Sequence, residues 1–155
     1  MKLKMKGRLN MDNLIKCLNE YLSDLKVFAT KLQNYHWNVK GKDFFIMHQK
    51  LEEYYDCAND AIDEVAESIL MVGGQPLGSL KDFMENTKIA EAKNEKVSSQ
   101  VVFDALLQDL TTLLDKTVKI KEEADSNKSY FISALMDNYI ADYNKKIWML
   151  KQSNE

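Results

Sequence analysis

Two histidines and a series of carboxylates lie between residues 33 and 67, and together they form a potential set of metal ligands. The histidines, His36 and His48, are the only two in the chain. The carboxylates follow on a segment that is expected to be helical: Glu52, Asp56, Asp60, Asp63, Glu64 and Glu67. Imidazole nitrogens and carboxylate oxygens are the ligand types that proteins use for iron and zinc. This stretch therefore predicts a metal site, and the rest of the chain is expected to be its scaffold.

The spacing of these residues restricts how they can meet. On an ideal helix of about 100° per residue, Glu52 shares one stripe with His48, and so do Asp63 and Glu67. His48 and Asp63 are 15 residues apart, however, which is about 22 Å along the helix axis. One ion binds its ligands within about 2.0–2.3 Å, so it cannot join both ends in one chain. Either there are two unrelated half-sites, or an antiparallel second copy of the helix completes them.

A two-fold axis gives the second alternative a specific form. It brings the histidine end of one copy, His36 and His48 with Glu52, against the acidic end of the other copy. That acidic end contributes Asp63 and Glu67, and the isologous contact generates two such sites. A di-iron site inside a single bundle needs Glu-x-x-His pairs on inward faces. Neither histidine has Glu three residues before it, so the sequence argues against a site inside one bundle.

The elements that must position these residues are long amphipathic helices, because apolar residues recur at three- and four-residue steps through most of the chain. Long helices are expected over residues 12–38, 44–71, 99–123 and 128–152. Asp43 is a plausible N-cap for the second helix, and Ser98 or Ser99 for the third. Residues 39–41 are expected to end the first helix, and ADSN at 124–127 to break the third.

The connection between the second and third long helices is expected to contain a short helix. GGQPLG at 73–78 ends the second helix with Gly and Pro. The segment SLKDFMEN at 79–86 then suits about two turns with Ser79 as their cap. Four long helices with one longer connection predict an all-α four-helix bundle with a crossover. An open helical array would need an internal repeat, which the sequence lacks.

Apolar stripes identify the expected core of the bundle. In the first helix they comprise Leu14, Leu18, Tyr21, Leu22, Leu25, Phe28, Ala29, Leu32 and Tyr35. In the third helix they comprise Val102, Leu106, Leu110, Leu113, Leu114, Thr117 and Ile120. In the fourth helix the pattern runs through Phe131, Leu135, Tyr139, Ile147 and Leu150. Tyr54, Tyr55 and Trp148 are expected to be packing residues, and Cys57 a small buried one.

Composition and charge place the chain among single-domain helical proteins. It has 155 residues with one proline and five glycines, too few turn residues for many short strands. Residues 1–11 are expected to be a flexible basic leader, and residues 12–152 a single domain. The leader carries four of the 21 basic residues, Lys2, Lys4, Lys6 and Arg8, whereas the body is acidic.

Targeting signals and cysteine spacing bear on the compartment. The basic N-terminus lacks a following apolar segment, and no run approaches the roughly 20 apolar residues of a membrane span. Cys17 and Cys57 fit no CxxC spacing, and they are expected to be free, partly buried thiols. We therefore expect a soluble cytoplasmic protein that does not associate with membranes.

Several motifs resemble the signature of the Dps family, the DNA-binding proteins from starved cells, or mini-ferritins. They are NYHWNVKG, then FFxxH, then the spacing H-x3-E-x10-D-x3-E ending in DEVAE. The likeness continues through ILMVGGQPLGSLKDF and through IWML near the C-terminus, so it covers about residues 12–151. The resemblance implies a ferritin-like bundle that assembles into a hollow homododecamer.

The resemblance also implies a ferroxidase site between two-fold-related subunits. His36 and His48 would be ligands from one subunit, with Glu52 beside them as a weak ligand. Asp63 and Glu67 would come from the other subunit. The family oxidises Fe²⁺, usually with hydrogen peroxide in preference to dioxygen, and mineralises the ferric product inside the shell. Trp37 is a potential electron donor, while Asp56, Asp60 and Glu64 are expected to be surface charges or dimer contacts.

The ferroxidase is one of three interpretations of the same residues. The runner-up is a non-enzymatic shell, DNA-compacting or structural, whose metal site is weak or holds zinc. The basic leader is able to neutralise DNA phosphates, and many copies on one shell would act together, although the acidic body opposes this. A small helical-bundle adaptor is a third alternative, but it gives no reason for the matched histidines.

One departure from the family concerns the route of iron entry. The family's three-fold pores are commonly lined by acids near the start of the last helix. That region here reads ADSNKSYFIS, in which Asp125 is the only acid and Lys128 lies nearby. We therefore expect slower entry, or another arrangement of Glu122, Glu123 and Asp125. Lys145 and Lys146 stand where the family often has a Lys-His pair.

Overall fold

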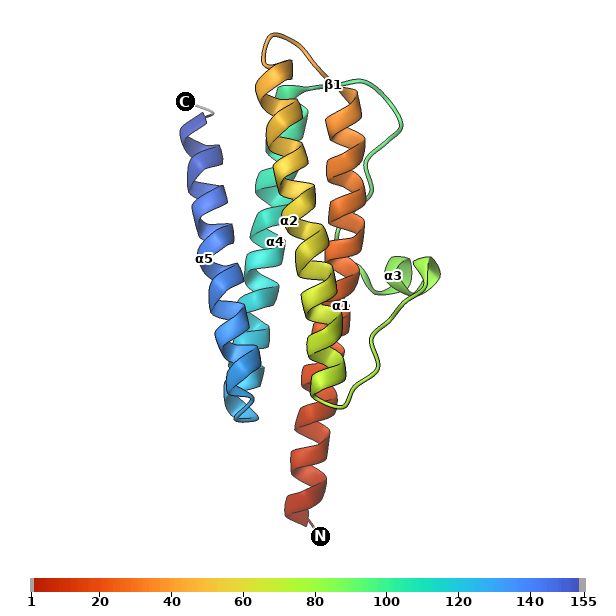
Figure 1. Ribbon diagram of the computed structural model, residues 1–155, viewed down its shortest axis with the longest axis vertical. Coiled ribbons are helices and arrows are strands. Elements are labelled where there is room, and N and C mark those ends of the chain that lie inside the picture. Colours follow the sequence, from red (N-terminus) through yellow and green to blue (C-terminus); the bar gives the residue numbers. More distant parts are fainter. Residues whose placement is uncertain (1, 154–155) are drawn as a thin grey trace.

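The computed structural model is an all-α protein built on four long helices, as the sequence predicts (Figure 1). It describes residues 2–153, and for residues 2–10 it describes the backbone alone. Within that range the elements are α1 (Lys2–Asn38), β1 (Val39–Lys40), α2 (Phe44–Met71), α3 (Leu80–Asn86), β2 (Val97–Ser98), α4 (Ser99–Ser126) and α5 (Tyr130–Ser153). The predicted bundle with a short helix in its crossover is confirmed.

The helices pack as two antiparallel pairs. α1 packs along α2, α4 packs along α5, and α1 also contacts α4. The crossover carries α3, which packs against α1, and then returns beside α1 to the end of the bundle where α1 and α2 are joined (Figure 1). There β2 pairs with β1 in parallel, Val39 opposite Val97 and Lys40 opposite Ser98. The crossover thus braces the connection between α1 and α2.

The core follows the predicted stripes in α1 and α4. Every α1 residue of the predicted stripe is buried, and so are those of α4 except Leu114, which is partly buried. In α5, Phe131 is 43% exposed, whereas Ile132, Met136 and Tyr143 are buried. Of the predicted stripe, Leu150 is buried and Leu135, Tyr139 and Ile147 are packed against the core, so only Phe131 departs from the prediction.

Serine caps start α3 and α4 as predicted. The hydroxyl of Ser79 accepts a hydrogen bond from the backbone N–H of Asp82 at 3.2 Å, and that of Ser98 accepts one from Val101 at 3.4 Å. α2 ends at Met71, and Gly73 follows with a φ of 80°, a conformation that favours glycine. The predicted ends of α2 are therefore confirmed, including the glycine after its last turn.

Asp43 is not the side-chain cap that the sequence predicts. Its carboxylate makes no capping hydrogen bond to α2 and instead accepts one from the hydroxyl of Ser99, at 3.1 Å between oxygens. Ser99 lies on α4, 56 residues further along the chain. A contact between distant segments has therefore replaced the local one, and it ties the α1–α2 connection to α4.

Two helix boundaries differ from the prediction. α1 begins at Lys2, well before residue 12, because the lysine, methionine, leucine and arginine residues of this segment favour helix and Gly7 alone does not break it. α4 continues to Ser126, through most of the segment predicted to interrupt it. The side chains of residues 1–10 lie outside the described ones, so the flexibility of the leader stays a prediction.

Candidate metal centre

The two histidines meet where α1 ends and α2 begins. His36 is in the last turn of α1, and His48 is in the second turn of α2. The connection between the two helices reverses the chain within a few residues and passes through Gly41 at a φ of 128°, which other residues rarely adopt. The short connection places residues twelve positions apart side by side.

His36 and His48 hold each other through two reciprocal hydrogen bonds. Nδ1 of His36 lies 2.7 Å from the main-chain oxygen of His48. Nδ1 of His48 lies 2.8 Å from the main-chain oxygen of His36. The rings stack with centroids 3.6 Å apart and planes inclined by 17°. A carbonyl oxygen only accepts, so each Nδ1 must carry the proton and donate it.

This pattern fixes the tautomer of both rings. A neutral imidazole protonated on Nδ1 keeps its lone pair on Nε2, where it can bind a metal ion. The main-chain oxygen of His36 lies in the last turn of α1, where carbonyls have no partner within the helix, and the ring of His48 supplies one. The pair therefore offers two prepared nitrogen ligands and closes the end of α1 as well.

Aromatic side chains and the crossover surround the pair. The ring of Tyr55 meets His36 edge to face at 5.5 Å, and Phe44 stacks on His48 at 5.0 Å. His36 is only 7% exposed. Lys96, from the crossover, donates through Nζ to the main-chain oxygen of Trp37 at 3.0 Å. Packing and hydrogen bonds from several elements thus determine the orientation of the rings.

Two exposed residues, Trp37 and Glu52, lie close to the pair along the chain. Glu52 lies one turn after His48 on the same face of α2, and its side chain is exposed. Partial burial and the nearby Glu52 carboxylate raise the pKa of Tyr55, which locates Glu52 close to the ring that covers His36. Trp37 exposes 65% of its surface. Its role as an electron donor stays a prediction.

The acidic end of α2 has a different character. Asp63 and Glu67 are exposed and line an open hollow together with Asn59, Asp60 and Glu64. Among the described side chains, neither Asp63 nor Glu67 takes part in a hydrogen bond or an ion pair. α2 is continuous from Phe44 to Met71, so His48 and Asp63 remain about 22 Å apart along it.

The structure therefore brings His36 and His48 together, with Glu52 nearby, and leaves Asp63 and Glu67 at a distance. In the described part of the chain, no three side chains of His, Cys, Asp or Glu converge as a metal site requires. The donor set suits iron, because two neutral imidazoles and three carboxylates are available in all. Each end of α2 alone offers too few ligands to enclose an ion.

Other residues singled out in the sequence have mixed outcomes. Asp56 and Asp60 are exposed, as expected of surface charges. Cys57 is exposed rather than buried, because its position on α2 faces the space between α2 and α5. Trp148 is 61% exposed and is not a packing residue of the described chain. Glu64 accepts a hydrogen bond from the hydroxyl of Tyr139, a long-range contact that no local pattern signals.

The segment before and at the start of α5 contains few acids, as the sequence shows, and a lysine from α4 lies beside its negative charge. Nζ of Lys121 lies 3.0 Å from a carboxylate oxygen of Asp137 and 3.9 Å from one of Asp125, and it donates to the hydroxyl of Ser133. The one acid in this segment therefore sits beside a positive charge, which makes the segment a weak attractor of cations.

Comparison with known proteins agrees with the fold and identifies the family. Residues 15–154 match the family model described as a ferritin-like domain, which makes the chain a ferritin-like protein. It is 36% identical over 138 residues to DNA protection during starvation protein 2 of Bacillus anthracis, covering 89% of this chain and 94% of the relative. The chain belongs to the Dps family within the ferritin-like proteins, as its motifs predict.

Solved structures show the same fold. A Dps protein from Vibrio cholerae, described as a member of a superfamily of ferritin-like diiron-carboxylate proteins, superposes with a TM-score of 0.91 at 31% identity, covering 95% of this chain and 92% of that one. A Listeria innocua Dps superposes with a TM-score of 0.87 at 29% identity, covering 90% and 92%. That protein is a variant with two histidines replaced by glycine, and their spacing equals that of His36 and His48.

Within residues 2–153, no helix combines the length and the apolar character that crossing a membrane requires.

Proposed function

We propose that this protein is a ferroxidase and iron-storage protein that acts as a hollow homododecamer. The observation that carries the proposal is the reciprocal hydrogen bonding of His36 and His48, which leaves Nε2 of both rings available. A pair of nitrogen ligands needs both Nε2 atoms to be available, whereas a purely structural pair of histidines has no such requirement.

The complete site forms between two copies of the chain. One copy supplies His36, His48 and Glu52, and the other supplies Asp63 and Glu67. Carboxylates from the second copy contribute the negative charge that the neutral imidazoles lack, and Fe²⁺ accepts both ligand types. Two-fold symmetry then produces two sites per pair of chains.

The reaction consumes Fe²⁺ and hydrogen peroxide together. Two Fe²⁺ ions give two electrons to one peroxide molecule, which becomes two hydroxide ions, and the Fe³⁺ produced enters the mineral inside the shell. Because iron and peroxide are both removed, less hydroxyl radical forms near DNA. The names of the Bacillus and Listeria relatives, DNA protection during starvation proteins, agree with such a role.

Stopped-flow oxidation tests the proposal directly. The protein is loaded with Fe²⁺ without oxygen, mixed with peroxide, and compared with the double variant His36→Ala/Asp63→Ala. We expect the double variant to oxidise Fe²⁺ at least about 100-fold more slowly, since even supporting residues of metal sites contribute 10–100-fold. Asp56→Ala, an exposed acid on the same helix, is the matched control and should keep the native rate.

Unchanged kinetics in the double variant would show that the site is wrong. The same experiment separates the runner-up, a non-enzymatic shell with a weak or zinc-occupied site. In that case the native chain would bind zinc but would not accelerate the oxidation of Fe²⁺ by peroxide over that in buffer.

DNA is the proposed partner of the basic leader. Lys2, Lys4, Lys6 and Arg8 supply positive charge that binds DNA phosphates without sequence preference, and twelve leaders on one shell act together. Retardation of plasmid DNA at low salt should be present for the full chain and lost after deletion of residues 1–10. Retardation that survives the deletion would assign DNA binding elsewhere.

A further inference from the structure

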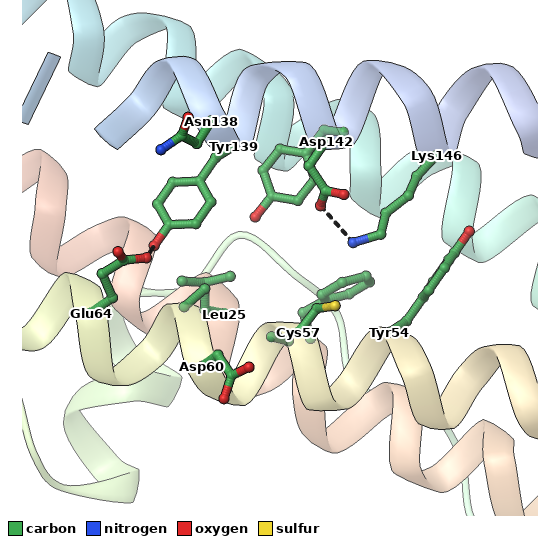
Figure 2. Close-up of a pocket in the computed structure, with 13 residues that line it drawn as sticks. Leu25, Tyr54, Cys57, Asp60, Glu64, Asn138, Tyr139, Asp142 and Lys146 are labelled. Atoms are coloured by element: carbon green, nitrogen blue, oxygen red, sulfur yellow. Dashed lines mark hydrogen bonds and ion pairs between the residues drawn. The ribbon is translucent and has the colours of Figure 1, made fainter. Parts of the chain in front are cut away.

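A hollow of about 300 Å³ lies between α2 and α5, away from the two histidines. Four of the side chains around it are easily oxidised, namely Tyr54 and Cys57 from α2 and Tyr139 and Tyr143 from α5. Figure 2 shows Tyr54 and Cys57 rising from α2 and Tyr139 reaching across the hollow from α5 to Glu64. The proposed iron oxidation uses none of these residues.

Three tyrosines form a continuous cluster from this hollow into the core. The ring of Tyr139 meets Tyr21 edge to face at 5.9 Å and lies nearly parallel to Tyr143 at 6.5 Å. The hydroxyls of Tyr21 and Tyr143 share a hydrogen bond of 2.5 Å. Tyr21 is fully buried and Tyr143 is 5% exposed. We call Tyr21, Tyr139 and Tyr143 the tyrosine cluster.

The cluster touches the acidic hollow through one residue. The hydroxyl of Tyr139 donates to the carboxylate of Glu64, which also lines the hollow of Asp63 and Glu67. Any strong oxidant formed near those acids therefore has Tyr139 as a close phenol. Burial, together with the neighbouring Glu64 and Tyr143, raises the pKa of Tyr139. Tyr139 consequently remains a neutral phenol with a hydrogen atom to give.

We propose that the tyrosine cluster is a sink for one-electron oxidants, with Tyr139 as its entry point. A hydroxyl radical, formed when Fe²⁺ reduces peroxide by one electron, takes one electron and one proton from the O–H of Tyr139 and becomes water. Tyr139 becomes a neutral phenoxyl radical. Tyr143 or Tyr21 then transfers one electron and one proton to Tyr139, which becomes a phenol again. The unpaired electron is then held on a buried tyrosine in the core.

This sink goes beyond the proposed ferroxidase, and only the iron-derived source of the radical rests on it. The benefit would be local, because the oxidant ends in a shielded phenoxyl rather than in a broken backbone or an attack on exposed groups. A tyrosine cluster with a purely structural role would contribute to stability, but it would not determine which residue carries the radical after oxidation.

Pulse radiolysis without iron tests the sink independently. Azide radicals, each of which takes one electron to become azide, are generated around the full-length assembled protein, and the phenoxyl radical is followed by its absorption and by electron paramagnetic resonance. If the seven tyrosines shared the damage evenly, losing one would remove a small fraction of the signal. We expect Tyr139→Phe to lower the long-lived phenoxyl yield roughly twofold or more, and the double variant with Tyr143→Phe to add little beyond it, as coupled positions do.

Tyr130→Phe is the matched control, because Tyr130 is on the same helix and 68% exposed. It should leave the long-lived signal unchanged, and all variants keep the aromatic ring and should assemble normally. A signal that is equal in the native chain and in Tyr139→Phe/Tyr143→Phe would overturn the sink. Because no iron is present, that outcome would leave the ferroxidase proposal untouched, and a failed ferroxidase assay would likewise leave the sink standing.

Discussion

The two ends of α2 differ in how far their own chain fixes the side chains that they contribute to the proposed metal site. At its beginning, His48 is stacked on a buried His36, and both Nδ1 atoms are hydrogen-bonded to main-chain oxygens. At its other end, Asp63 and Glu67 are exposed, and within the described residues nothing neutralises them. The histidines are preorganised by their own chain, whereas the two carboxylates remain solvated and repel each other.

This difference indicates that folding and assembly contribute different parts of the proposed metal site. The nitrogen ligands need fixed orientation and a defined tautomer, which a single folded chain provides through backbone carbonyls. The carboxylates are exposed and have no such support from their own chain, so on this account a second copy only has to bring them to the histidines. On this account assembly, rather than folding, completes the metal site.

Removing a ligand should therefore lower the stability of the chain only when the ligand is a histidine. This is the largest effect on stability that we expect. His36→Ala removes a buried ring and the hydrogen bond that its Nδ1 donates to the main-chain oxygen of His48, and should lower the free energy of unfolding by about 2 kcal/mol. Glu67→Ala removes an exposed acid without partners and should change it by less than about 0.5 kcal/mol. Urea unfolding of both variants measures the contrast, and equal losses would remove the distinction between the two ends.

A buried carboxylate on α1, Asp24, should make the stability of the protein depend on pH. Asp24 is fully buried on α1 and accepts hydrogen bonds from the hydroxyl of Thr87 and the N–H of Lys88 in the crossover. Burial raises its pKa above the ordinary 3.8 despite these bonds. The folded state thus binds the proton more tightly than the unfolded chain, so the contribution to stability is greatest below pH 3.8 and declines as pH rises through the raised value.

Asp24→Asn should abolish that decline. The neutral amide keeps an oxygen for both donors, so the variant should become more stable than the native chain as pH rises to neutrality, by on the order of 1 kcal/mol. Unfolding curves collected from acid to neutral pH give the measurement. If the curves of the two proteins run parallel throughout, the slope originates elsewhere, for example at Asp109, the other buried carboxylate whose pKa burial raises.

The smallest effect should be a gain in stability at the acidic end. Asp63 and Glu67 are four residues apart on α2, a spacing at which like charges repel. Asp63→Asn should stabilise the unassembled, metal-free chain by about 0.2–0.5 kcal/mol. Calorimetric melting at low salt is sensitive enough to detect this, and the gain should vanish at high salt. A loss of stability would reveal a partner of Asp63 within its own chain.

Much of the fold follows from local patterns in the sequence. The glycines and proline of residues 73–78 located the end of α2, and Ser79 and Ser98 identified the starts of α3 and α4, because these signals act within one helical turn. The buried stripe of α1 was predicted in full for the same reason. In α5, four of the five residues of the predicted stripe pack against the core, and only Phe131 is exposed.

What the sequence could not predict depends on contacts between distant segments. The bond from Ser99 to Asp43 and the pairing of β1 with β2 join residues more than 50 positions apart. The reciprocal bonding of His36 and His48 depends on the backbone of the connection between their helices, which neither residue specifies. Helical spacing did predict that the histidines and Asp63 stand apart, since the rise of a helix is fixed.

Mixing two damaged subunits tests the shared site most directly. His36→Ala and Asp63→Ala chains are each expected to lack ferroxidase activity as pure assemblies, since every site loses one ligand. A mixed pair has one site that loses both ligands and one that keeps them all. Shells reassembled from equal amounts should therefore recover about one quarter of native activity, since half of the pairs are mixed. Activity no higher than that of the two separate variants would contradict a site shared between chains.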